Sequence, residues 1–252
     1  MHGFPRNGYL WRDCLRPAAA AGFRSLAPDL LGLGESTGPQ ASDFSAAAQA
    51  DLLIALLERT GVVDVRLVGE GFGARVVMAL ALRGPARVRA VVLADPPPAA
   101  GFTAGRLAGA LARGGHGDLV LEILRGGRAL ARLDLAPGRE GRGPLLDREL
   151  WLRPLLASPE SRARAAALLA ATGEPDTAGL EERFAREGDV PTLVCSRGRA
   201  AGEAPRSLRP LARLRRAHEV PLRDSAARLL ERDPSAFLDL VLPFLAAVEA
   251  RG

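Results

Sequence analysis

The sequence contains no lysine, only two cysteines and few aromatic residues. All 34 basic side chains are arginine, and with 29 acidic residues the formal net charge is +5. A basic balance of this kind raises the possibility of a nucleic-acid partner. The arginines, however, are scattered among the acidic residues, and aromatic residues that stack on bases make up only 4% of the chain. We therefore expect a solvated charged surface and no nucleic-acid partner.

Cysteine and histidine are equally sparse. Cys14 and Cys195 are too few for a disulfide framework and are typical of a reducing cytosol, so we expect a cytoplasmic protein. The three histidines (His2, His116 and His218) are dispersed and form no metal-ligand spacing with the cysteines. No apolar run approaches the roughly 18 residues that span a bilayer, and no signal peptide is recognisable. We expect no metal, no cofactor and no membrane partner, and the sequence leaves the oligomeric state open.

What the chain does contain is a pattern of alternating strands and helices, consistent with one large domain of 252 residues. Strand-like runs occur at 23–29, 65–70, 90–95, 190–196 and 218–222, and helical patterns at 9–21, 43–58 (capped by Asp43), 72–82 and 235–249. This alternation predicts an α/β fold with a mostly parallel, doubly wound sheet. Residues 101–187 contain no strand-like run, so we expect a core from 1–100 and 188–252 with a helical cap from 101–187.

Three motifs, in this order and spacing, resemble the α/β-hydrolase superfamily in its haloalkane dehalogenase and epoxide hydrolase branch. They are His2-Gly-Phe-Pro5 followed by Tyr9-Leu-Trp-Arg12, then 27–36, then the strand and turn Val65–Gly73 with the next strand. The resemblance covers 1–98 closely and 188–252 loosely. In this family a segment before His-Gly supplies the first three strands, and the third lies between the strands matching 23–29 and 65–70. We therefore expect an inner strand to be missing from the sheet, which leaves backbone hydrogen-bonding groups exposed on both flanking strands. A misplaced start codon or a truncated chain is favoured over a natural absence of this strand.

The hydrolytic mechanism that the family implies needs a nucleophile, an acid and a histidine. The nucleophile position is Gly71, in the middle of Gly69-Glu-Gly-Phe-Gly73. The usual acid position holds Ala200, with Glu203 as a possible substitute nearby. The histidine position, seven residues before Pro234, holds Ala227. The resemblance therefore implies that the triad is missing.

Other residues offer partial replacements, each with an ordinary structural alternative. Some dehalogenases carry the acid where this chain has Asp95, although a carboxylate there also caps a helix or pairs with arginine. His2 is usually structural in the family, His218 begins a strand at the amino end of the sheet, and His116 lies in a cap loop that is either solvated or able to reach the pocket. Trp151 either lines the pocket or anchors the cap.

Several further chemistries are disfavoured. The cap contains no tyrosine, because Tyr9 is the only one, so the acid catalysts of epoxide hydrolases are absent. Cys195, on a buried strand, is interpreted as packing. The Gly69–Ala74 segment lacks the third glycine of a dinucleotide fingerprint, so NAD is not expected.

The oxyanion hole of the family needs no side chains. The resemblance places it at the backbone N–H groups of Phe4 and Phe72, where the amino end of a helix adds a positive field. Gly71 also leaves space beneath the bound carbonyl. We therefore expect a carbonyl or carboxylate to bind at the carboxyl edge of the sheet. The expected pocket residues are His2, Phe4, Glu70, Gly71, Phe72, Asp95, Trp151 and Ala227.

These features support three hypotheses. The first is substrate-assisted epimerisation or isomerisation in specialised metabolism, in which Asp95, Glu70, Asp224 or a group of the substrate is the base. In lacking a triad the chain resembles the α/β-hydrolase-fold peptide epimerase of bottromycin-type pathways, which implies a small-molecule or peptide substrate. The second is a non-catalytic protein that binds a ligand or peptide. The third is a residual hydrolase with an unrecognised nucleophile.

Overall fold

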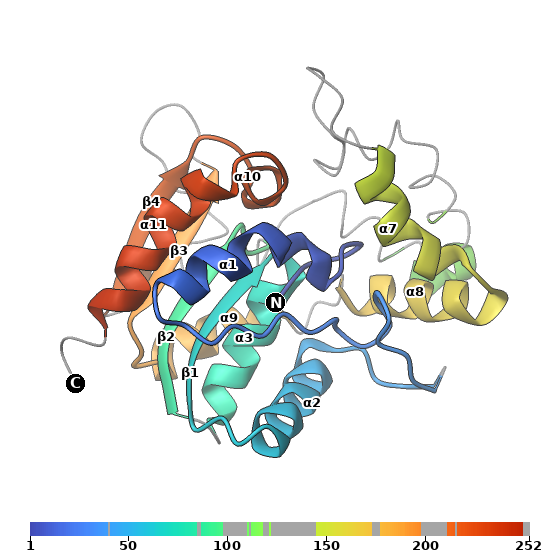
Figure 1. Cartoon of the computed structure of the whole chain (residues 1–252). Coiled ribbons are helices and arrows are strands. Elements are labelled where there is room, and N and C mark those ends of the chain that lie inside the picture. The colour runs from blue at the N-terminus through green and yellow to red at the C-terminus, as the bar shows by residue number, and fades with distance from the viewer. Residues whose placement is uncertain are drawn as a thin grey trace.

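Four parallel strands form the centre of the protein (Figure 1). The computed structural model describes residues 1–39, 41–84, 87–97, 110, 112–117, 121, 145–172, 177–197, 211–214 and 216–248. Within them the sheet has the order β1 (Asp64–Glu70), β2 (Arg87–Ala94), β3 (Thr192–Arg197) and β4 (Ala217–Leu222). All neighbouring pairs are parallel. The parallel sheet and four of the predicted strands are therefore confirmed.

Helices precede and follow these strands along the chain. They are η1 (Gly8–Trp11), α1 (Arg12–Ala20), α2 (Ala46–Arg59), α3 (Phe72–Arg83), η2 (Ala112–His116), α7 (Leu145–Leu156), α8 (Pro159–Thr172), α9 (Thr177–Glu187), η4 (Leu211–Arg213), α10 (Ala226–Arg232) and α11 (Pro234–Ala247). The predicted cap of α2 is wrong by two residues, because Ser45 and not Asp43 accepts a hydrogen bond from the Ala48 amide at the helix start. Asp43 instead accepts from the Ser45 amide.

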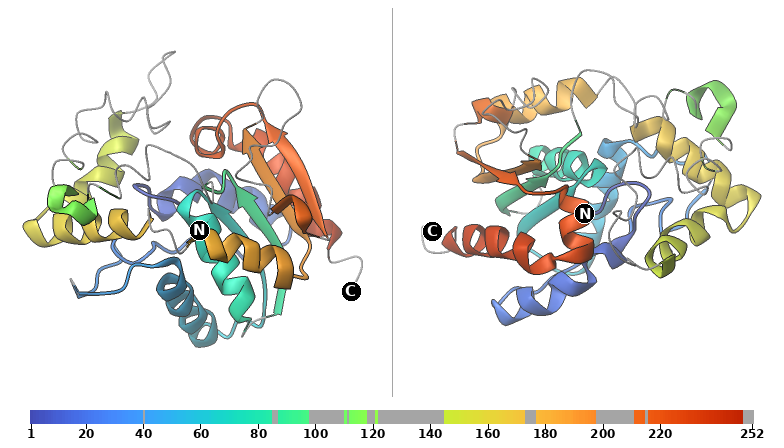
Figure 2. Two further views of the ribbon diagram at one scale, coloured as in Figure 1. Left: turned by 180° about the vertical axis from the view of Figure 1, so that it is seen from behind. Right: turned by 90° about the horizontal axis from the view of Figure 1, so that it is seen from above.

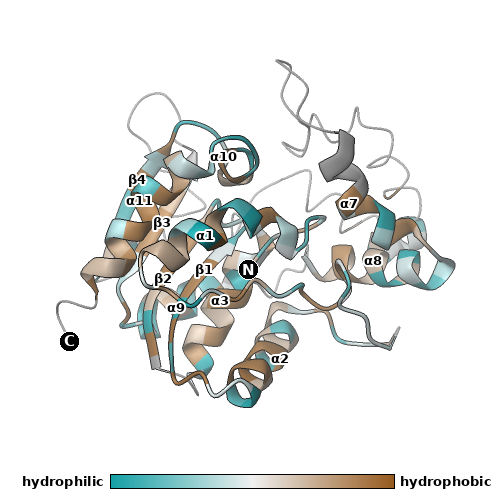
Figure 3. Cartoon of the chain, in the orientation of Figure 1, coloured by the Kyte–Doolittle hydropathy of each residue, from teal (hydrophilic) through white to brown (hydrophobic). Residues whose placement is uncertain are grey.

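The helices cover both faces of the sheet, and the alternation of side chains along β2 decides which core each residue joins. Val91 and Leu93 pack in one hydrophobic cluster with residues of α2, α3 and α9. Val92 and Ala94 point to the opposite face and pack with residues of α1, α10 and α11. Figure 3 shows the resulting apolar colour on the central strands and on α11. Near-continuous apolar strands are what a parallel sheet covered on both faces requires.

The expected strand at 23–29 does not form. These residues are not assigned to any strand, and most of them are partly or fully exposed. A groove of about 480 Å³ separates them from β1 and is lined by both segments. A strand is held by ladder hydrogen bonds to a neighbouring strand. Within the described residues, no strand lies in this groove to pair with 23–29. Met1 contacts the carboxyl end of this flank, because its amino group donates to the Val68 carbonyl and its own carbonyl accepts from the Glu70 amide. The preceding residues of β1 line the groove.

The described parts of 101–187 are helical. α7 and α8 pack against each other, and α8 also packs against η2. Both views in Figure 2 place α7 and α8 beside the core, on the side away from α11. α9 packs against α3 instead, so the last helix of the expected cap contributes to the helix layer of the core. No helix among the described residues is long and apolar enough to cross a membrane.

Candidate functional site

The turn between β1 and α3 is built on three glycines, each required for a different physical reason. Gly71, the N-cap of α3, has φ +55° and ψ −124°, a conformation that side-chain-bearing residues rarely adopt. A Cβ on Gly69 would lie 2.4 Å from the carbonyl oxygen of Gly73. A Cβ on Gly73 would lie 2.4 Å from the carbonyl oxygen of Met1. The glycines therefore permit both the sharp elbow and the close approach of the N-terminal segment.

His2 holds that N-terminal segment in place. Its side chain is fully buried, and Nε2 accepts a hydrogen bond from the Leu30 amide at 3.0 Å. Burial lowers the pKa of His2 to about 4, so the ring is neutral at pH 7. The other ring nitrogen, Nδ1, lies 3.3 Å from the Gly3 carbonyl oxygen. Both ring nitrogens thus contact backbone groups, which favours the structural alternative for His2 over a place in the pocket.

The amides expected to bind a carbonyl lie next to each other. A Cβ on Gly3 would lie 3.1 Å from the backbone nitrogen of Phe72, so the segment carrying Phe4 packs directly on the elbow. Phe72 is the first residue of α3, where helix amides have no intrahelical acceptor. Among the described residues, neither the Phe4 nor the Phe72 amide has a recorded hydrogen-bond acceptor. The positive end of α3 adds to their capacity to hold a negative oxygen.

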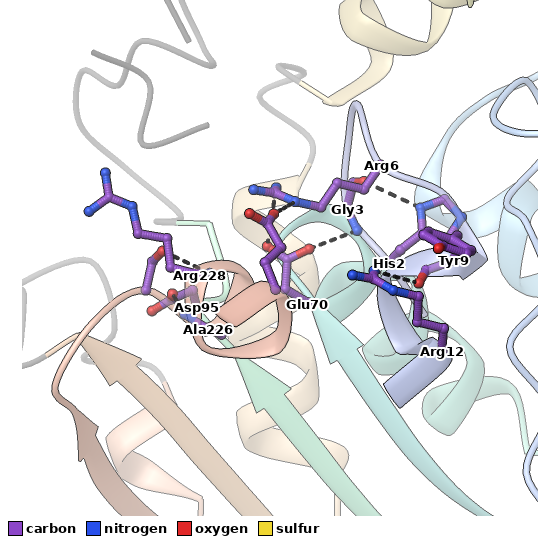
Figure 4. Close-up of polar contacts among 11 residues, drawn as sticks. His2, Gly3, Arg6, Tyr9, Arg12, Glu70, Asp95, Ala226 and Arg228 are labelled. Carbon is purple, nitrogen blue, oxygen red and sulfur yellow. Dashed lines mark hydrogen bonds and ion pairs between the residues drawn. The ribbon is translucent and has the colours of Figure 1, made fainter. Parts of the chain in front are cut away.

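A buried cluster of charges stands beside this elbow (Figure 4). Glu70, the last residue of β1, accepts a hydrogen bond from the Gly3 amide through Oε2 at 2.9 Å. Arg6 Nη1 lies 4.0 Å from Glu70 Oε1, and Arg6 Nε donates to Glu231 Oε1 at 2.8 Å. The Arg6 guanidinium also lies over the Trp151 ring, 5.3 Å from its centroid. The cluster therefore joins the elbow, α10 and α7 through one arginine.

The environment of Glu70 disfavours its ionised form. Burial raises the pKa of Glu70 most strongly, and the charges of Asp95 and Glu231 add to this effect. The Arg6 guanidinium and the hydrogen bond from Gly3 act in the opposite direction. The net direction is upward from 4.5. A buried carboxyl with a raised pKa, one residue from the elbow glycine, is a candidate for proton transfer.

Asp95 lies near Ala227 in the structure. By the resemblance, Asp95 stands at an alternative position of the acid and Ala227 at the position of the histidine. Asp95 follows β2 with φ +43°, and its Oδ2 accepts a short hydrogen bond from the Ala226 amide. Ala227 is the next residue of α10 and is buried. Because Ser225 caps the same helix, Asp95 acts as a second acceptor at the start of α10. The geometry favours the helix-capping alternative for Asp95.

The remaining candidates are distributed away from the elbow. His218 lies near the start of β4, as expected, and contacts Phe244, while His116 is exposed. Trp151 is buried against Arg6, which favours the interpretation as a cap anchor. Cys195 is buried, and desolvation raises its pKa to about 12. Ala200 and Glu203 lie outside the described residues. No group of residues suited to holding a metal ion occurs in the described part of the chain.

Sequence reasoning did not identify Arg6 and Glu231. They are 225 positions apart, so no local pattern connects them. The available signal was the charge of Arg6 itself, which directly follows the apolar Phe4-Pro5 pair within the first motif.

Sequence comparison identifies relatives of the first part of the chain. Residues 1–113 match the family profile described as the alpha/beta hydrolase fold. Epoxide hydrolase 2 of Siraitia grosvenorii is 38% identical over 93 residues, which are 36% of this chain and 29% of that protein. The haloalkane dehalogenase of Mycolicibacterium paratuberculosis is 34% identical over 96 residues, or 38% of this chain and 32% of that protein. The chain thus spans under a third of the length of these two curated relatives.

Structural similarity extends over nearly the whole chain. An epoxide hydrolase solved without ligand superposes with a TM-score of 0.75 at 22% identity, covering 98% of this chain and 90% of that one. A structure described as a putative epoxide hydrolase from Pseudomonas aeruginosa has the same TM-score and identity, covering 99% of this chain and 88% of that one. At this level of identity the likeness concerns the fold.

Proposed function

The chain has the α/β-hydrolase fold, and from that premise we propose that it binds a carbonyl or carboxylate compound at the Phe4 and Phe72 amides and promotes enolisation instead of hydrolysis. The substrate is a small molecule or a peptide with a hydrogen on the carbon next to the bound carbonyl. Epimerisation or isomerisation at that carbon is the net reaction.

The observation that carries this proposal is the combination of two backbone donors with a glycine at the elbow. The Phe4 and Phe72 amides lie beside each other at the start of α3 and have no recorded acceptor among the described residues. Within the described residues, the one atom within 4 Å of a Cβ placed on Gly71 is the Gly3 Cα, at 3.7 Å, so these residues leave room at the nucleophile position. Gly71 and Ala227 also leave the nucleophile and histidine positions without reactive side chains. A carbonyl held there is polarised, and position 71 offers no side chain to attack it.

Polarisation of the carbonyl acidifies the neighbouring C–H bond. A base removes the proton, the C–H electron pair forms the C=C bond of the enolate, and the carbonyl π electrons move to the oxygen held by the two amides. Return of a proton to the other face inverts the carbon, and return to a different carbon of the conjugated system gives an isomer. A carboxylate of the protein or of the substrate itself supplies the base.

Hydrolysis is the second candidate, because the relatives in sequence and in structure carry the names of hydrolases. With glycine at position 71, a hydrolytic reaction requires a water molecule or a nucleophile from another part of the chain. The two candidates therefore predict different products from the same ester.

The experiment follows N-acetyl-phenylalanine ethyl ester and the matching thioester with the protein in D₂O, using mass spectrometry and chiral chromatography. The proposal predicts deuterium at the α-carbon and loss of optical purity, with no acid released beyond the protein-free rate. Release of acid, or labelling of the protein by a fluorophosphonate, establishes the residual hydrolase. Saturable binding of both compounds without exchange or hydrolysis establishes a non-catalytic binding protein.

A further inference from the structure

Three carboxylates are candidates for the base, and the structure distinguishes them. Asp95 is occupied at the start of α10, where it accepts from the Ala226 amide. Asp224 is half-buried, accepts from the Ser225 amide at 2.7 Å and lies 3.6 Å from Arg228 Nη1. Glu70 is 6% exposed and directly precedes Gly71. Only Glu70 belongs to the elbow itself.

The Glu70 carboxylate also lies next to the carbonyl-binding amides. The position of a Cβ on Gly3 is 2.9 Å from Glu70 Oε2 and 3.1 Å from the Phe72 nitrogen. Glu70 Oε2 and the Phe72 nitrogen therefore lie close together on the same side of Gly3. One lone pair of Oε2 accepts the hydrogen bond from the Gly3 amide, and the other lone pairs of the carboxylate can accept a proton. A carbonyl oxygen bound at the Phe72 amide would therefore lie near the Glu70 carboxylate.

Arg6 controls the charge of this carboxylate. It is 2% exposed and lies between Glu70 and Glu231, so one guanidinium serves a buried and a partly buried carboxylate. The Trp151 ring covers its other side and excludes water. Burial of this kind strengthens the electrostatic coupling between the three groups.

We infer that Glu70 is the catalytic base of the enolisation and that Arg6 is its positioning residue, which holds the carboxylate beside the elbow and favours its charged form. This inference rests on the proposed function. In the forward step the proton moves from the substrate carbon to a Glu70 carboxylate oxygen, and the C–H electron pair enters the enolate. In the return step Glu70 gives a proton to the enolate carbon, which restores the carboxylate. Exchange of the carboxyl proton with D₂O before this step introduces deuterium into the product.

The titratable groups that face Glu70 come from four parts of the chain: the Met1 amino group, whose pKa burial lowers to about 5, Arg6, Asp95 and Glu231. Because Arg6 opposes the upward shift caused by burial, its removal is expected to raise the Glu70 pKa further. Neutralising Glu231 removes a carboxylate that raises the Glu70 pKa and is expected to lower it. The two changes therefore move the Glu70 pKa in opposite directions, which separates an electrostatic effect from a general disturbance of the cluster.

The test is a ¹³C NMR titration of the protein labelled at the glutamate carboxyl carbon, with Glu70→Gln used to assign the signal. Glu70 is expected to titrate above 4.5, and Arg6→Lys, which keeps the charge, is expected to stay close to this value. Arg6→Met should raise the midpoint by about one unit or more. Glu231→Gln should lower it, and this variant keeps the test decisive if Arg6→Met does not fold. An unchanged Glu70 midpoint in the folded variants overturns the role of Arg6.

The second arm measures α-carbon deuterium exchange of the same N-acetyl-phenylalanine thioester. Glu70→Gln should reduce exchange about 100-fold or more, while Glu219→Gln, the same change at an exposed carboxylate of β4, should leave it unchanged. Equal exchange in Glu70→Gln and the wild type disproves Glu70 as base but leaves the proposed function intact. No exchange in the wild type, with the NMR shifts as expected, instead refutes the proposed function and leaves the Arg6–Glu70 coupling standing.

Discussion

Gly73 allows the N-terminal segment to reach the elbow, and replacing it with alanine tests that arrangement directly. The new Cβ would lie 2.4 Å from the Met1 carbonyl oxygen and 2.6 Å from that of His2. Both contacts are with backbone, so a rotamer change cannot relieve them. Overpacking of this kind costs about 1–3 kcal/mol, and we expect the upper part of that range because His2 is pinned to Leu30. For a chain of this length the melting temperature should fall by about 5–10 °C.

Gly61→Ala is the matched control. Gly61 has φ +65°, but a Cβ there meets nothing within 4 Å, so this variant carries the backbone strain without a clash. It should cost about 1–2 kcal/mol. Urea denaturation followed by circular dichroism gives both free energies of unfolding, and phenylacetate binding reports on the carbonyl site. Gly73→Ala should be the less stable variant and should lose binding, whereas Gly61→Ala should keep it. A Gly73→Ala protein as stable as the wild type, with binding intact, refutes the close approach.

Further predictions concern individual side chains. Burial lowers the pKa of His2 from 6.5 to about 4, so the unfolded chain binds more protons than the native state between these pH values. The free energy of unfolding should therefore fall by on the order of 3 kcal/mol as the pH falls from 6.5 to 4. Urea titrations of His2→Gln should show a weaker pH dependence. Asp95→Asn should cost about 0.3–1 kcal/mol through the start of α10 and leave thioester exchange in place; loss of exchange would return Asp95 to the list of bases. Cys14 and Cys195 are buried with pKa values raised to about 11 and 12, so Ellman's reagent should label neither until the protein is unfolded.

Much of the fold could be predicted because its signals are local. Apolar runs of the right length predicted β1 to β4, and the glycine spacing predicted the elbow between β1 and α3. The segment 23–29 shows where this reasoning fails. Its residues have strand-like propensity, but a strand exists only when a neighbour completes its ladder, and no single-segment pattern contains that information.

The candidate site divides in the same way. The backbone donors at Phe4 and Phe72 follow from motifs that are each contiguous in the sequence. The Arg6–Glu231 pair and the contact between Asp95 and Ala226 join residues far apart in the chain, and only the folded sheet brings them together. The sequence shows the positive charge of Arg6, but it does not show that Glu70 and Glu231 are its partners.

The most direct test of the carbonyl site is a titration of ¹⁵N-labelled protein with phenylacetate, followed through the backbone amide signals. The Phe4 and Phe72 amides should move downfield together and saturate with one dissociation constant. Gly71→Leu fills the space under the bound carboxylate and should abolish both shifts, while Gly71→Ser, which has a smaller side chain, should retain them. If phenylacetate leaves the Phe4 and Phe72 signals unchanged, or if Gly71→Leu folds and shows the same shifts as the wild type, the ligand does not bind at the elbow and the account is contradicted.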